Sequence, residues 1–124
     1  LKATVAQIKH LKEGDTVGYN RRFKATKPTN VATIRIGYAD GLRRSMGNNV
    51  GEVFINNHRA PIIGSVCMDM CMIDVTNIPV NVGDTAEIFG MHISVKEVAQ
   101  KCQTISYEIL TGIGQRVKRV YIEE

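Results

Sequence analysis

The sequence lacks tryptophan, has only three cysteines among its 124 residues, and contains no long apolar run. Because a membrane-spanning helix needs roughly 20 consecutive apolar residues, we expect no membrane segment. The cysteines, Cys67, Cys71 and Cys102, are an odd number without a CxxC pair, so they predict neither a disulfide framework nor a zinc ribbon. This pattern favours a protein of the reducing cytoplasm.

The charge pattern argues against a nucleic-acid partner. The formal net charge is +4, but the basic residues are spread along the chain and tryptophan is absent. The densest basic cluster, residues 116–119, alternates with Val117 and Val120, which predicts a closing strand over residues 116–122 with one solvated face. The histidines lack obvious partner ligands, so we expect no metal site.

The composition is that of one globular domain. Hydrophobic residues make up 44% and charged residues 23% of the chain, and no repeat or linker interrupts it. We therefore expect a single domain over residues 1–124. The sequence starts without Met or a basic leader and alternates like a strand from its first residues, so we expect it to begin within a longer protein.

Short β-branched runs separated by glycine or asparagine turns predict a mainly β fold, a Greek-key-like β-barrel with one or two short helices. The strands are expected over residues 3–10, 16–19, 31–36, 52–55, 58–64, 71–75, 85–89 and 116–122. Asn56 and Asn57, which accept positive φ, should join a hairpin.

The helical signals lie outside these strands. Ser94 and Glu97 form a capping box that predicts a helix reaching Cys102, and a second helix is expected over residues 106–110. Residues 42–46 suit a single helical turn. Residues 20–30 read as an exposed basic loop.

The stretch Ile36-Gly37-Tyr38-Ala39-Asp40-Gly41 is the first candidate site. It ends an apolar strand, and its two glycines and Asp40 allow a sharp turn that leaves Tyr38 exposed. An Asp-Gly turn with a packing tyrosine is also a common structural feature, so these six residues alone leave both interpretations open.

Five blocks together resemble the C-terminal domain of alanine racemase, the pyridoxal-phosphate enzyme that interconverts L- and D-alanine. They are GDTVGY (14–19), ATIRIGYADG (32–41), VCMD with DVT (66–69 and 74–76), TISYEI (104–109) and RVKRVY (116–121). The resemblance spans nearly the whole chain.

The resemblance implies a two-domain enzyme. An N-terminal α/β barrel holds pyridoxal phosphate through a lysine, while this β-domain covers the barrel of the second subunit in a homodimer. That barrel is absent from the sequence, and no lysine here matches the cofactor lysine. We therefore expect a cytoplasmic bacterial isomerase that makes D-alanine for peptidoglycan when full-length, with no cofactor bound to this fragment alone and no activity from it.

Individual residues match roles in the family. Tyr19 matches the tyrosine base that works opposite the barrel lysine, and Met68 the position whose backbone N–H binds the substrate carboxylate. Tyr107 matches the tyrosine that contacts the cofactor phosphate and narrows the site around Tyr19. The active-site entrance is matched by Tyr38, Arg44, Asp69 and Ile105.

One departure and several alternatives stay open. Ser65 stands where many family members carry an arginine, which removes positive charge from the entrance. From residue type alone, Tyr19 suits a packing ring and Met68 a core filler, and Cys71 is expected to pack rather than react. The function alternatives are a serine or broad-specificity racemase, or a non-catalytic dimerisation module of the same fold.

Overall fold

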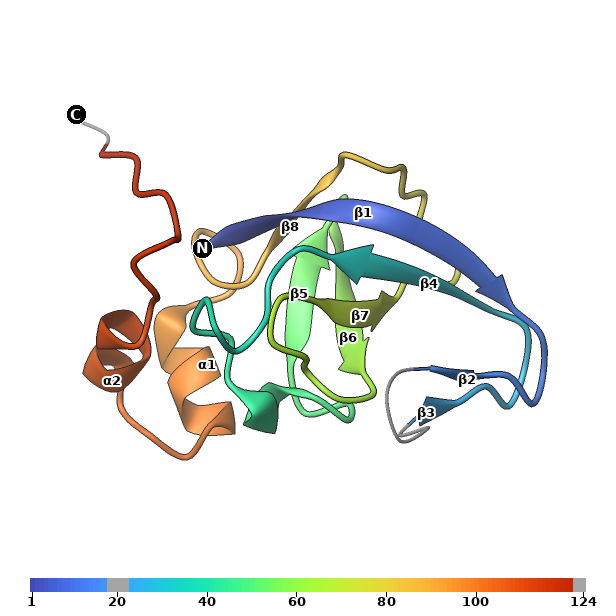
Figure 1. Cartoon of the computed structure of the whole chain (residues 1–124), viewed down its shortest axis with the longest axis horizontal. Helices are drawn as coiled ribbons and strands as arrows, with labels where there is room; N and C mark the ends of the chain where they lie inside the picture. The colour runs from blue at the N-terminus through green and yellow to red at the C-terminus, as the bar shows by residue number, and fades with distance from the viewer. Residues whose placement is uncertain (18–22, 122–124) are drawn as a thin grey trace.

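The computed structural model describes residues 1–17 and 23–121 (Figure 1). Its strands are β1 (Lys2–Leu11), β2 (Thr16–Val17), β3 (Phe23–Lys24), β4 (Thr29–Ile34), β5 (Glu52–Ile55), β6 (His58–Ile63), β7 (Cys71–Asp74) and β8 (Thr85–Glu87). Its helical elements are the 3₁₀ turn η2 (Arg44–Met46), α1 (Val95–Lys101) and α2 (Ser106–Thr111).

Six strands close into an antiparallel barrel in the order β1-β4-β7-β6-β5-β8. Strands β5, β6 and β7 follow one another and β8 returns beside β5, which is the Greek-key arrangement. The predicted fold class is therefore confirmed. Strands β2 and β3 form a separate two-stranded sheet at the end of the molecule opposite the two helices (Figure 1).

The barrel interior is filled by every second residue along its strands, the residues whose side chains face inward. Burial alternates along β5 and β7, as expected for strands with one solvated face. The helices add Val98, Ala99 and Ile109 to the same core, so the fold is one packed unit. The fully buried residues of the barrel strands include Ile34, Val53, Ile55, Ile62 and Ile73.

The local signals confirmed by the structure are those carried by adjacent residues. Asn56 and Asn57 have φ of 47° and 66° and join β5 to β6. The Ser94 hydroxyl accepts a hydrogen bond from Glu97 N at 3.1 Å at the start of α1. Gly112 follows the last residue of α2.

The central strand ends earlier than predicted. Strand β4 stops at Ile34: Arg35 N still donates to Thr4 O of β1 (3.0 Å), but Ile36 N turns back and donates to Ile34 O (3.0 Å). The prediction of a loop over residues 20–30 is also wrong in part. Phe23 and Lys24 form β3, and β4 begins at Thr29.

The predicted closing strand is wrong over residues 116–121, which form turns and irregular backbone. The barrel is already closed by the pairing of β1 with β8, so no strand edge of the barrel remains for this segment. Arg119 instead donates to the carbonyls of Ile113, Gly114 and Val117 within its own segment.

Cys71 lies inside the barrel. Only 1% of its surface is exposed, and burial, with a smaller effect from Cys67, raises the pKa of Cys71 to about 12. The thiol is therefore neutral at physiological pH and packs, as predicted.

Glu87, at the end of β8, is a buried carboxylate that organises the turn before α1. Its Oε2 accepts hydrogen bonds from His92 N and Ile93 N, both at 2.8 Å, and its Oε1 contacts His92 Nδ1 at 3.1 Å. The His92 ring in turn stacks on Phe54 with centroids 3.9 Å apart. Burial alone would raise the pKa of Glu87, but the hydrogen bonds from His92 and Ile93 outweigh it and lower the pKa below its ordinary value.

We expect Glu87→Gln to lower the free energy of unfolding by about 1–2 kcal/mol at neutral pH, since charge-assisted hydrogen bonds become neutral ones. The folded pKa is the lower one, so this contribution is complete above the ordinary glutamate pKa of about 4.3 and is lost as pH falls through the folded value. Urea unfolding at several pH values should show the two proteins converging in acid. Glu13→Gln, at an exposed site, is the control. A gap that persists unchanged in acid would contradict this account.

Candidate functional site

The Tyr38 turn packs its backbone directly against the segment that joins β6 to β7. Tyr38 N donates to Cys67 O at 2.9 Å, and Ala39 N donates to Met68 O at 3.0 Å. A Cβ at Gly37 would overlap the carbonyl oxygens of both Cys67 and Met68, so only glycine permits this approach. The two segments therefore form one rigid unit.

Asp40 fixes the turn from within. Its Oδ2 accepts from Gly37 N at 3.0 Å, and Gly37 O accepts from the backbone N–H of Asp40 (3.0 Å) and of Leu42 (3.2 Å). Gly41 has φ of 115°, which turns the chain toward η2. Tyr38 remains 45% exposed, so the sequence-based interpretation of this stretch as a sharp turn with an exposed tyrosine is confirmed.

Met68 stands beside the Tyr38 turn and is 53% exposed. Its carbonyl is bonded to Ala39, and the flanking turn is closed by Cys67 N donating to Met70 O at 2.9 Å. Within residues 1–17 and 23–121, the Met68 N–H donates no hydrogen bond. Among the described residues this N–H therefore has no acceptor, and hydrogen bonds on both sides of it hold its backbone in place.

Arg116 connects the two segments through their side chains. Its Nε donates to Asp40 Oδ1 at 2.6 Å, and its Nη2 donates to Asp69 Oδ1. The hydrogen bonds that Arg116 donates to Asp69 and Asp40 raise the pKa of Arg116, so the guanidinium stays charged. Gly114 N also donates to Asp40 O at 2.9 Å, which brings the chain after α2 against the Tyr38 turn.

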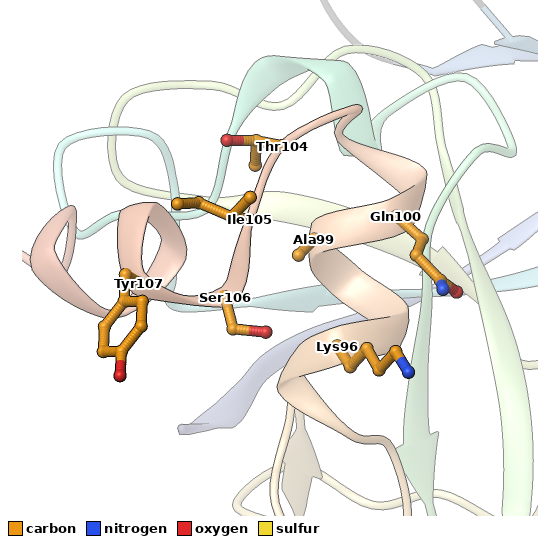
Figure 2. Close-up of a pocket in the computed structure, with 7 residues that line it drawn as sticks. All are labelled: Lys96, Ala99, Gln100, Thr104, Ile105, Ser106 and Tyr107. Atoms are coloured by element: carbon orange, nitrogen blue, oxygen red, sulfur yellow. The ribbon is translucent and has the colours of Figure 1, made fainter.

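Ile105 and Tyr107 lie in a second group, at the connection between α1 and α2. Both line a groove beside α1, together with Ser106 and with Lys96 and Gln100 of that helix. In Figure 2 the Ser106 side chain points toward α1, whereas the Tyr107 ring points away from it. The groove has a volume of about 450 Å³. Ile105 is 64% and Tyr107 78% exposed, so both side chains are available to another protein surface or ligand.

Arg44 is the first residue of η2, and its side chain is exposed. Its neighbour Arg43, rather than Arg44, reaches α2: Arg43 Nη2 donates to Glu108 Oε1 at 2.6 Å, and Thr104 Oγ1 donates to the same oxygen at 2.7 Å. These bonds lower the pKa of Glu108. They also attach the helix that carries Tyr107 to the Tyr38 side of the barrel.

Tyr19 lies outside the described residues. Its described flanks are strands β2 and β3, in which Val17 pairs with Phe23. The hairpin packs on the barrel through a small cluster of Val17, Val31 and Ile63. The segment from Gly64 to Met70 starts against this hairpin, since a Cβ at Gly64 would lie 3.5 Å from Val17 O, and it ends at the Tyr38 turn.

The described part of the chain offers no other obvious chemistry. No cluster of three or more His, Cys, Asp or Glu side chains in residues 1–17 and 23–121 could hold a metal ion. The helices of this part are too short to cross a bilayer. The exposed donors and aromatic rings around Tyr38, Met68 and Tyr107 remain the candidate site.

Comparison with known proteins identifies the family. A family model described as "Alanine racemase, C-terminal domain" matches residues 1–121. The chain belongs to this family. It is 45% identical to the alanine racemase of Brucella ovis over 98% of the chain and 31% of that protein. It is 41% identical to the alanine racemase of Clostridium kluyveri over 99% of the chain and 32% of that protein.

Solved structures agree with this family assignment. The chain superposes on the alanine racemase of Bartonella henselae, solved with covalently bound pyridoxal phosphate, with a TM-score of 0.93 and 40% identity. That match covers 98% of this chain and 34% of the other. For the Bacillus anthracis alanine racemase with bound L-Ala-P, the TM-score is 0.89 at 37% identity, over 98% of this chain and 32% of the other. The chain thus spans about a third of the length of these relatives.

The structure unites some predicted site residues and adds others. Tyr38, Met68 and Asp69 lie together, whereas Ile105 and Tyr107 lie where the connection from α1 enters α2. The bridge between Asp40 and Arg116 was missed, because these residues are 76 positions apart and nothing near Arg116 in the sequence indicates a partner. Only the packing of the segment after α2 against the Tyr38 turn brings them together.

Proposed function

We propose that this chain is the C-terminal domain of a pyridoxal-phosphate-dependent alanine racemase that interconverts L- and D-alanine. The observation that carries the proposal is the family match over residues 1–121. The Met68 N–H beside the exposed Tyr38 supports it, since this N–H has no acceptor among the described residues and a substrate carboxylate needs a fixed donor.

Racemisation requires that a proton leave one face of the α-carbon and that another arrive on the opposite face. We assign one of the two bases to Tyr19 and the other to the lysine of an N-terminal barrel. A phenol has an ordinary pKa near 10, so the assembled site must favour the phenolate through positive charge or hydrogen bonds. The Met68 amide would hold the substrate carboxylate and thereby orient the α-carbon between the bases.

One described residue, Tyr107, suits a contact with the phosphate group of pyridoxal phosphate. The Tyr107 hydroxyl is exposed, and no residue of the described ranges hydrogen-bonds to it, so it is free to donate to a phosphate oxygen. When bound, the cofactor supplies the electron sink for the charge left at the α-carbon. We assign the remaining cofactor contacts to the barrel.

We further propose a homodimer in which this domain covers the barrel of the second subunit. Tyr38, Met68, Ile105 and Tyr107 are all large, partly apolar and at least 45% exposed, and such surfaces usually meet a partner. The enzyme would work in the cytoplasm and supply D-alanine for peptidoglycan.

The test uses the full-length protein loaded with pyridoxal phosphate. We expect it to convert L-alanine to D-alanine and the reverse, measured by chiral chromatography, and to favour alanine over serine. The 124-residue chain without the barrel should produce no D-alanine. Conversion of serine at equal or higher kcat/KM would favour the broad-specificity alternative. No racemisation at all, from a folded and loaded protein, would favour the non-catalytic dimerisation module.

A further inference from the structure

We propose that Arg116 is a positioning residue for the substrate carboxylate: it fixes the Met68 amide relative to the Tyr38 turn and neutralises the carboxylates that flank that amide. The inference rests on the proposed function, because it assigns Arg116 a task at the same carboxylate contact. Arg116 itself need not touch the substrate.

The geometry of the bridge carries the positioning role. One guanidinium donates through Nε to Asp40 of the Tyr38 turn and through Nη2 to Asp69, the residue after Met68. The backbones of the same two segments are already in contact between Ala39 and Met68. Arg116 therefore holds the same two segments together through the side chains of Asp40 and Asp69, and we infer that this bridge fixes the direction of the Met68 N–H.

The electrostatics of the bridge carry the neutralising role. Asp69 is adjacent to the proposed carboxylate donor, and its side chain is 58% exposed. An unpaired Asp69 would repel a substrate carboxylate at this amide. Ser65 supplies no positive charge to the entrance, so Arg116 is the cation that the described residues place against both Asp40 and Asp69.

The bridge also lies at the edge of a surface hollow shared with Arg35. Arg35 is exposed, and its side chain makes no hydrogen bond or ion pair within the described ranges. It therefore offers a matched control: Arg35→Met removes the same charge from the same hollow without breaking the bridge.

The experiment compares Arg116→Met, Arg116→Lys and Arg35→Met in the full-length, cofactor-loaded protein. We expect Arg116→Met to raise KM for alanine, and Ki for the competing carboxylate propionate, about tenfold with kcat changed less than about threefold. Arg116→Lys should recover only part of the loss. It restores the positive charge, but an ammonium lacks the planar fork that reaches two carboxylates. Arg35→Met should leave KM and Ki unchanged.

A double variant separates this role from a merely structural one. Adding Asp69→Asn to Arg116→Met removes the repelling charge and should lower KM several-fold relative to Arg116→Met alone. Three results would overturn the inference: an unchanged KM in Arg116→Met, an equal rise in KM in Arg35→Met, or a fall in kcat and Tm of Arg116→Met without a change in KM. In each of these cases racemisation by the wild-type protein would still support the proposed function. If the loaded wild-type protein does not racemise alanine, both fall together.

Discussion

Tyr19→Phe in the full-length protein is expected to lower kcat for alanine racemisation by about 10³-fold. The variant keeps the aromatic ring and removes only the hydroxyl that we assign as one of the two bases. General acid-base groups contribute about 10²–10⁴-fold, and a phenylalanine offers no substitute proton acceptor. Substrate and cofactor binding should change little, because the carboxylate contact is assigned to Met68 and the phosphate contact to Tyr107.

Hydrogen exchange gives this prediction its sharpest form. In deuterated water, Tyr19→Phe should stop exchange at the α-carbon of one alanine enantiomer and leave exchange of the other, which the barrel lysine still performs. Proton NMR of the two enantiomers measures this directly. Tyr38→Phe is the matched control: it also removes a phenol hydroxyl, at a position assigned to the entrance, and should cost less than about tenfold. Equal loss of exchange for both enantiomers, or unchanged kinetics, would remove Tyr19 from the mechanism.

Gly37→Ala is expected to destabilise the protein by about 2–4 kcal/mol and to abolish most racemase activity. The added methyl group would overlap the carbonyl oxygens of Cys67 and Met68, which are backbone atoms and cannot rotate away. Relief requires the Tyr38 turn to move away from the Met68 segment, which displaces the proposed carboxylate donor. Thermal unfolding and alanine turnover measure the two effects.

Gly83→Ala provides the comparison. Gly83 has φ of 94° but no atom within 4 Å of an added Cβ, so alanine there meets only backbone strain. We expect a loss of about 1–2 kcal/mol and unchanged turnover. Equal losses for the two variants, with activity retained in Gly37→Ala, would show that the close approach at Gly37 does not shape the site.

Features encoded by adjacent residues were predictable from the sequence. The Asn56-Asn57 turn, the Ser94 cap on α1 and the alternating strands each depend on side chains within a few positions of one another. The Greek-key barrel follows because several such strands must share one apolar interior. The Tyr38 turn was predictable for the same reason, since Gly37, Asp40 and Gly41 are all local.

Long-range features were not predictable in this way. Residues 116–119 alternate like a strand, but the pairing of β1 with β8 leaves them no strand edge in the barrel. The Arg116 bridge depends on carboxylates 76 and 47 positions away. The role of Tyr19 came from family resemblance alone, because an isolated tyrosine after a short strand carries no chemical signature.

The most direct test of the central claim is subunit complementation in the homodimer that we propose for the full-length protein. One subunit carries Tyr19→Phe, the other carries alanine in place of the barrel's cofactor lysine, and differently tagged subunits are purified as heterodimers. If Tyr19 serves the partner's barrel, one of the two sites is intact and the heterodimer should show about half of the wild-type activity, although each parent homodimer is inactive. Heterodimers as inactive as the parents would contradict the account, because each site would then contain one defect.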